Sequence, residues 1–325
     1  FFIITTMCFI LIKLLPLPAV KEQGRDVELI LARREAMGYN KPILVQYMLF
    51  WKHILFYGDF GLGEQLYSGQ EVSKIVLQKI PYTVIVNLYS IIVAVPVGIA
   101  LGIFAALKKN KWQDHVISTI VMLLISVPSY VYAFVVQYFL CFKTGWFSLT
   151  VASQDQASFF SWTMFKSMMP TVISLAFGTI ASLTRFTRAE LAEVLTGEYL
   201  LLARTKGLTR RQAVVRHAMR NAMVPILPMI LGEFIGILYG SLVIEKIFSV
   251  PGIGNLYVNS IYVRDYTFFM ALTMFYTLIG LVGGLVTDLS YGFIDPRIKA
   301  QYVRIKKKKA KPQLAAAGGR GDEQA

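Results

Sequence analysis

Apolar runs separated by short charged segments set the pattern of this chain. Four runs, at 82–107, 116–142, 220–244 and 267–294, are long enough to cross a hydrocarbon core of ~30 Å as helices. A fifth run, 168–184, is shorter, but it has no charged residue and can lengthen at either end at a modest mismatch cost. Together with the apolar start of the chain, these runs predict an all-α polytopic membrane protein with six transmembrane helices.

The start of the chain is almost uniformly apolar over residues 1–15. This is below the ~20 residues that a spanning helix needs, so we expect a first transmembrane helix over 1–18 whose start is missing. A cleaved signal peptide is the alternative. It has weaker support, because no basic region precedes the run and residues 16–19 (PLPA) make a poor cleavage site.

Prolines lie inside three of the four longest apolar runs, at Pro96, Pro128, Pro225 and Pro228. In a membrane bundle, neighbouring helices and Ser or Thr side chains can satisfy the backbone groups that a proline frees. We therefore expect kinks at these positions, which suit helices that move.

Basic residues gather in three segments that follow the second, fourth and sixth predicted helices. These segments lie at 108–111, 185–220 and 297–311. Lys and Arg are enriched in cytoplasmic loops, so both termini are expected in the cytoplasm. The segments 143–166 and 246–266 carry few basic residues and are expected on the outside.

The remaining segments give the domain organisation. Residues 19–80 mix charges of both signs, and the apolar positions between 43 and 55 recur at helical spacing. We predict a small external subdomain over 19–80 and a five-helix core over 81–300. A basic, disordered cytoplasmic tail is expected over 301–325, because its composition cannot bury a core.

The composition agrees with a membrane location. Hydrophobic residues make up 55% of the 325 residues and charged residues only 16%, whereas soluble domains carry about 25% charged residues. A net charge of +14 could also suggest a nucleic-acid partner, but the basic residues follow the loops, so we expect membrane lipid as the partner instead. Cys8 and Cys141 lie in apolar runs and offer no metal-ligand cluster.

The most informative segment is 185–220, which is amphipathic, basic and lies between two predicted spans. A short helix is expected over 199–205, ended by Gly207 in the left-handed conformation, with Thr209 capping the next helix. The resulting helix–Gly–helix knuckle suits docking into a groove of a partner protein. A helix lying on anionic lipid headgroups is the alternative, and composition alone does not separate the two.

Particular motifs in this segment resemble a known family. Residues 201–207 read LLARTKG and residues 217–222 read HAMRNA, followed by Pro225. This pattern resembles the cytoplasmic loop of binding-protein-dependent ABC importer permeases, in the oligopeptide, dipeptide and nickel branch. Leu201 stands where the wider superfamily has Glu, as is usual in the peptide branch. Further motifs extend the resemblance over nearly the whole chain: 41–47, GDFG at 58–61, FSVPGIG at 248–254, RDY at 264–266 and DPRI at 295–298.

The resemblance implies a type I ABC importer permease fold, close to the B-type oligopeptide permease subunit of the bacterial inner membrane. It implies a heterodimer with a C-type permease, two cytoplasmic ATPase subunits that bind ATP and Mg, and an extracytoplasmic substrate-binding protein. The chain itself has no G-x-x-x-x-G-K-[ST] loop, so the ATP that drives transport is expected on other subunits. The residues implied to couple to the ATPases are Tyr199, Leu200, Leu201, Leu202, Ala203, Arg204, Lys206 and Gly207.

Three residues are candidates for the translocation path. Glu233 falls near the middle of the fifth predicted span, where a carboxylate costs at least ~2.5 kcal/mol and normally faces protein or water. It could meet the amino group of a peptide, or it could be neutralised within the bundle. Pro251 and Gly252 belong to a tight or re-entrant loop that could constrict the path, or that could be a plain turn.

The expected function is ATP-driven import of oligopeptides or dipeptides by alternating access. Within the same family, nickel, glutathione or another small solute is the alternative substrate. An ion-coupled secondary transporter is a further alternative, although one central carboxylate and no internal repeat give it little support. The chain has no catalytic motif of an intramembrane enzyme, and no catalytic or metal site is predicted.

Overall fold

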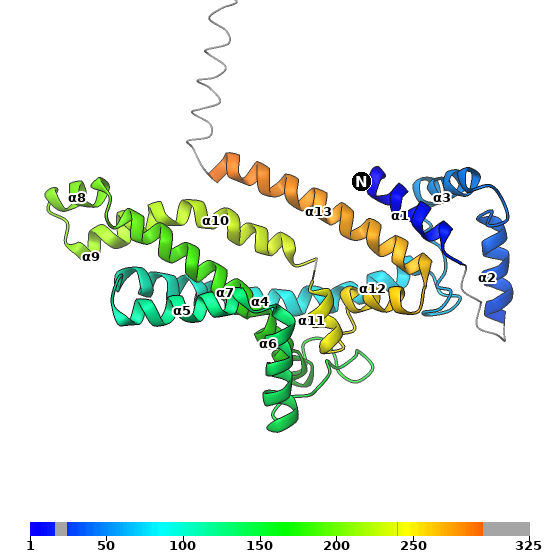
Figure 1. Cartoon of the computed structure of the whole chain (residues 1–325), viewed down its shortest axis with the longest axis horizontal. Coiled ribbons are helices and arrows are strands. Elements are labelled where there is room, and N and C mark those ends of the chain that lie inside the picture. The colour runs from blue at the N-terminus through cyan, green and yellow to red at the C-terminus, as the bar shows by residue number, and fades with distance from the viewer. Residues whose placement is uncertain (17–24, 239, 295–325) are drawn as a thin grey trace, which may run out of the picture.

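The computed structural model describes residues 1–16, 25–238 and 240–294, in which helices are the regular elements and a single bridge pairs Leu62 with Glu71. Most of the long helices lie along the length of the molecule (Figure 1). The predicted tail, 301–325, lies outside the described residues. In chain order the helices are α1 (Phe2–Leu14), α2 (Arg25–Ala36), α3 (Ile43–Tyr57), α4 (Val72–Leu107), α5 (Trp112–Ser126), α6 (Ser129–Val136), the π-helix η1 (Gln137–Lys143), α7 (Trp162–Val194), α8 (Glu198–Thr205), α9 (Arg210–Ala213), the π-helix η2 (Val214–Ala218), α10 (Met219–Gly236), α11 (Leu242–Ile247), α12 (Ile253–Tyr262) and α13 (Tyr266–Ile294).

Four helical segments in the described part are long and apolar enough to cross a membrane: α4, α7, Arg210–Gly236 and Tyr266–Ser290. A fifth span results if the bent pair of α5 with Ser129–Lys143 is counted as one. The first predicted span, over 1–18, corresponds to α1, which has 13 residues and is shorter than the ~20 residues that a span needs. The weak run at 168–184 is the middle of the 33-residue helix α7.

The run at 116–142 is not the continuous helix that its hydropathy predicts. Α5 ends at Ser126, Val127 is extended, and the next helical segment leaves at an angle of 103° (Figure 1). The physical reason is Pro128, which disfavours a helical conformation at the residue before it and so ends α5. Proline at this position breaks the helix, whereas Pro96 and Pro225 lie inside continuous helices.

The run at 220–244 also departs from its prediction, because α10 ends at Gly236 and a separate helix, α11, begins at Leu242. Gly240 between them has φ +57°, a left-handed conformation that glycine adopts without strain. Residues 72–80, assigned above to the external segment, form the first turns of α4.

In the described part, α4 and α7 form the most extensive helix–helix contact, and glycines make their close approach possible. A Cβ on Gly98 would lie 2.8 Å from Cβ of Leu183, and one on Gly102 would lie 2.5 Å from Cβ of Thr187. The Thr184 hydroxyl donates a hydrogen bond of 3.2 Å to the Gly98 carbonyl. Two glycines four residues apart thus form a small-residue face against which α7 packs, as is common between membrane helices.

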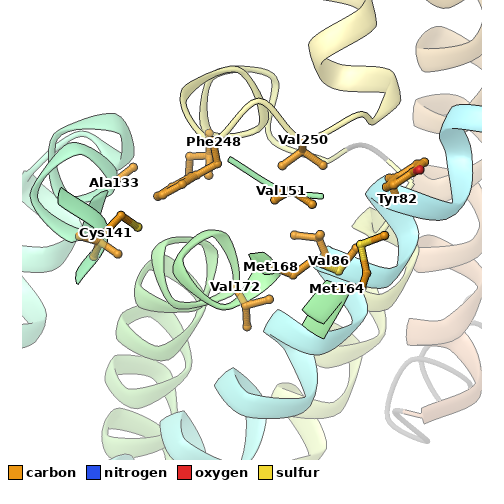
Figure 2. Packing of buried hydrophobic residues seen from close by; sticks show 12 residues of the cluster. Tyr82, Val86, Ala133, Cys141, Val151, Met164, Met168, Val172, Phe248 and Val250 are labelled. Atoms are coloured by element: carbon orange, nitrogen blue, oxygen red, sulfur yellow. The ribbon is translucent and has the colours of Figure 1, made fainter. Parts of the chain in front are cut away.

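A buried cluster fills the region where α6 leaves the bundle. Figure 2 shows side chains of α4, α6 and α7 converging on residues of the loop that follows α11. Phe248 and Val250 from that loop are 1% and 0% exposed, and the Val151 amide donates a 3.0 Å hydrogen bond to the Phe248 carbonyl. The two segments predicted to lie outside, 143–166 and 246–266, therefore pack on each other.

At the opposite end from α8, the helices α2 and α3 and the loop before α4 form a unit, the α2–α3 unit, that is tied to the start of α13 (Figure 1). Its anchor is Asp265, which is fully buried. One of its oxygens accepts backbone hydrogen bonds of 2.7–2.9 Å from Glu64, Gln65 and Leu66. Glu64 in turn pairs with Arg34 of α2 at 2.6 Å, so a chain of charged contacts fixes the α2–α3 unit.

Candidate functional site

The knuckle predicted from sequence is present. Α8 (Glu198–Thr205) ends before Gly207, whose φ of +86° is left-handed. Thr209 caps α9 through a capping box, in which its hydroxyl accepts from the Gln212 amide and the Gln212 side chain accepts from the Thr209 amide. Both turns are therefore fixed by local chemistry, and the segment forms a compact projection at one end of the long helices (Figure 1).

Side chains of α8 divide between the bundle and the surface. Ala203 is buried, and Leu200 packs against a cluster formed by Ala106, Leu191, Ala192, Ala218 and Ala222 from α4, α7, η2 and α10. Leu202 is 55% exposed, and Lys206 and Gly207 are also exposed. The side chains of Tyr199, Leu201 and Arg204 lie outside the described part. Leu200 and Ala203 thus hold α8 on the bundle, and Leu202 and Lys206 face outward.

An ion pair between the half-buried Arg188 and a buried carboxylate fixes the helix that leads into the knuckle. Arg188 of α7 makes two hydrogen bonds to Asp114 of α5, one of them from Nη2 to Oδ2 at 2.7 Å. Asp114 is 1% exposed and also accepts from the Asn110 amide at 2.9 Å. The basic loop at 108–111 and the end of α7 are thereby joined at the same end of the bundle.

Glu233 lines a cavity between α4, α7 and α10. The cavity has a volume of about 490 Å³, and its polar lining comes from Asn87, Ser90, Thr179 and Glu233. The Thr179 hydroxyl donates to Oε2 of Glu233 at 3.2 Å. The rest of the lining is apolar or glycine: Ile91, Leu175, Met229, Gly232, Gly236, Ile237 and Gly240. None of the described lining residues is cationic, so this part of the lining presents a single carboxylate among neutral groups.

The loop containing Pro251 and Gly252 is held by a second carboxylate. Glu245 is fully buried, and its Oε2 accepts from the backbone amides of Gly254 and Asn255 at 2.9 and 3.3 Å. A Cβ on Gly252 would lie 2.5 Å from that oxygen, so glycine is required for the close approach. Burial raises the pKa of Glu245 to about 7, although the two amides favour the charged form.

The structure brings some of the predicted residues together and separates others. Pro251 and Gly252 do not line the cavity of Glu233, whereas Gly240, beside Glu245, does. From the sequence, neither Glu245 nor Asp114 receives a role, and Asp265 enters only as part of the RDY motif at 264–266. The sequence position of Glu245 could have pointed to it, because it directly follows an apolar run and precedes a Gly-rich loop. A carboxylate buried at such a place needs backbone amides as hydrogen-bond donors.

The chain matches a family of known proteins over residues 98–300, described as binding-protein-dependent transport system inner membrane component. The dipeptide transport system permease protein DppB of Lactococcus lactis is 33% identical over 298 residues, which cover 92% of this chain and 94% of that protein. The oligopeptide transport system permease protein OppB of Haemophilus influenzae is 30% identical over 300 residues, which cover 92% of this chain and 94% of that protein.

A solved structure shares the fold. The solved structure is described as the crystal structure of an amino acid ABC transporter with histidines, and it superposes on this chain with a TM-score of 0.51 at 17% sequence identity. The superposition covers 67% of this chain and 94% of the other. The family match takes in more than half of the residues, and the full-length relatives are at least 30% identical. This chain therefore belongs to the binding-protein-dependent transport system inner membrane components, the permease components of ABC importers.

Proposed function

We propose that this permease component conducts short peptides across the bacterial inner membrane, driven by ATPases that act on α8. The peptide substrate is supported by relatives named for dipeptide and oligopeptide transport. The complex contains a second, C-type permease, two ATPase subunits that hold ATP with Mg, and an extracytoplasmic binding protein. The chain described here binds no nucleotide and hydrolyses none.

The observation that carries this proposal is the presentation of α8. Its inner side is packed on the ends of α4, α7 and α10, and Leu202 and Lys206 face outward. A rigid helix with an exposed apolar residue and a cationic rim suits a groove on a partner protein. The ATPases therefore grip a helix that cannot move without moving the bundle.

Movement reaches the cavity through α7. Thr179 at the cavity and Val194 at the end of α7 are separated by about 22 Å of one helix, at ~1.5 Å per residue. Arg188 ties α7 to α5 between these points. A rigid helix fixed in this way passes a displacement of α8 to the cavity, as alternating access requires.

The orientation follows from the basic loops. The loop at 108–111 and the knuckle lie at one end of the bundle, joined through Asp114 and Arg188. Because Lys and Arg concentrate in cytoplasmic loops, this end faces the cytoplasm and the α2–α3 unit faces outward. Both chain termini are then cytoplasmic.

The test replaces Leu202 with Lys in the reconstituted complex. If Leu202 is an anchor of the ATPase interface, its loss weakens ATPase binding by about 30-fold or more, the range of an interface hot spot. The measurements are the ATPase recovered with a tagged permease and ATP-driven uptake of a labelled dipeptide by liposomes. Val215→Lys is the matched control, because Val215 is 62% exposed and follows α9.

The contrary result is full ATPase recovery and full uptake with Leu202→Lys. Uptake by the permease alone without nucleotide would instead support the ion-coupled transporter. Uptake driven by ATP but restricted to nickel or glutathione would keep the ATPase coupling and change the substrate.

A further inference from the structure

Among the described residues that line the cavity between α4, α7 and α10, Glu233 is the one ionisable side chain. The side chain is half-buried, and none of the ion pairs in the described part includes it. A carboxylate in a membrane span is costly unless it meets a cation or water. The described lining therefore offers an acceptor for a positive group and contains no positive group itself.

One hydrogen bond positions the Glu233 carboxylate, and the carboxylate can still accept others. The Thr179 hydroxyl donates to Oε2, and Thr179 belongs to α7, opposite Glu233 on α10. Oε1 remains available, and it can take further hydrogen bonds. A primary ammonium group carries three donors and a full charge, so it matches this acceptor better than a neutral amide does.

The rest of the lining matches the body of a peptide. Asn87 and Ser90 of α4 supply a donor and acceptors on the other side of the cavity. Met229 and Leu175 supply an apolar wall, and Met adapts to differently shaped side chains. A volume of about 490 Å³ lies in the ordinary range of a small-molecule site.

We propose that this cavity binds the free α-amino group of a peptide in transit, with Glu233 as its counter-charge and Thr179 as the residue that positions Glu233. The inference rests on the proposed function and adds the part of the substrate that the permease recognises. Recognition of the α-amino group, and not of a side chain, allows peptides of different sequence to pass.

The test measures binding directly to the complex of permeases and ATPases in nanodiscs, with the binding protein left out so that its own selectivity does not enter. Ligand-observed NMR gives the Kd of dialanine and of N-acetyl-dialanine for wild type, Glu233→Gln and Glu193→Gln. Glu193 is an exposed carboxylate near the end of α7 and serves as the matched control.

We expect wild type and Glu193→Gln to bind dialanine about tenfold or more tightly than N-acetyl-dialanine, the factor of a charge-assisted hydrogen bond. Glu233→Gln loses this preference and binds N-acetyl-dialanine as wild type does. Thr179→Val lowers the preference partway, which separates positioning from charge. Thermal unfolding midpoints of the variants show whether each one is folded.

Three results overturn the inference: an unchanged preference in folded Glu233→Gln, no dialanine binding by wild type, or loss of the second permease from the Glu233→Gln complex. The last would assign the carboxylate to the subunit interface. ATP-driven uptake of dialanine by the same preparations with the binding protein separates the two proposals. If wild type transports while the preference is unchanged, the inference fails and the proposed function stands.

Discussion

Replacement of Gly102 by Ala tests whether close packing of α4 on α7 carries the stability of the core. The added Cβ would lie 2.5 Å from Cβ of Thr187 and 2.8 Å from the backbone oxygen of Thr184. The second contact is with main chain of a helix, which cannot rotate away as a flexible side chain can. The helices must therefore separate by several tenths of an ångström, and Gly98, one turn earlier, would lose its own contact with α7.

The expected cost is about 1–3 kcal/mol, the range for overpacking a close-packed core. The control is Gly284→Ala in α13, where the added Cβ meets nothing within 4 Å. Helix propensity alone favours Ala over Gly by up to ~1 kcal/mol, so the control is expected to be neutral or slightly stabilised. The two variants make the same chemical change, and they differ only in the space around it.

The assay is thermal unfolding in detergent, followed with a thiol-reactive fluorophore. Cys141 is buried and Cys8 is half-buried, so reaction of the thiols reports the opening of the bundle. Gly102→Ala should unfold at a lower temperature than wild type and Gly284→Ala at the same or a higher one. Equal midpoints for the two variants would refute the assignment of Gly102 to the close contact between α4 and α7.

Three further predictions concern the buried carboxylates. Burial raises the pKa of Glu245 to about 7, so the folded state holds a proton more tightly than the unfolded state. The free energy of unfolding therefore falls by about 3 kcal/mol as pH rises from the pKa of the unfolded state, ~4.3, toward 7. The difference between the unfolding midpoints at pH 5 and pH 8 should be smaller in Glu245→Gln than in wild type, and an unchanged difference would contradict this. Arg188→Met leaves Asp114 buried without its partner and should lower the free energy of unfolding by about 3–5 kcal/mol. The double variant Arg188→Met/Asp114→Leu should recover most of this loss. Additive losses in the double variant would argue against direct coupling of the two residues. Asp265→Asn weakens the acceptor of three backbone amides, so hydrogen exchange of residues 64–66 should accelerate about tenfold or more, while unchanged protection would mean that other contacts hold the loop.

Features set by neighbouring residues could be predicted from the sequence. The knuckle is the clearest example, since Gly207 ends one helix and Thr209 with Gln212 caps the next. The interruption at Pro128 was also visible, although its effect was not: proline indicates a kink or break, and the 103° angle depends on what the second segment packs against. Local chemistry gives the position of a break but not its direction.

Contacts between distant segments could not be predicted. Asp265 binds amides about 200 residues earlier in the chain, and Arg188 binds a carboxylate 74 residues away. No periodicity or cap links such positions, because each pairing arises only when the helices have packed. The cavity of Glu233 has the same origin: the sequence marks the carboxylate as costly, and the fold supplies Thr179 from α7.

Accumulation of a labelled dipeptide against its gradient is the most direct test of the central claim. Sealed liposomes would carry this chain with the second permease, both ATPases and enclosed ATP, with the binding protein added outside. We predict that the dipeptide reaches a higher concentration on the ATPase side only while ATP is hydrolysed, and that Leu202→Lys abolishes this accumulation and Val215→Lys does not. Equal accumulation with a non-hydrolysable ATP analogue, or with Leu202→Lys, would contradict an ATP-driven importer coupled through α8.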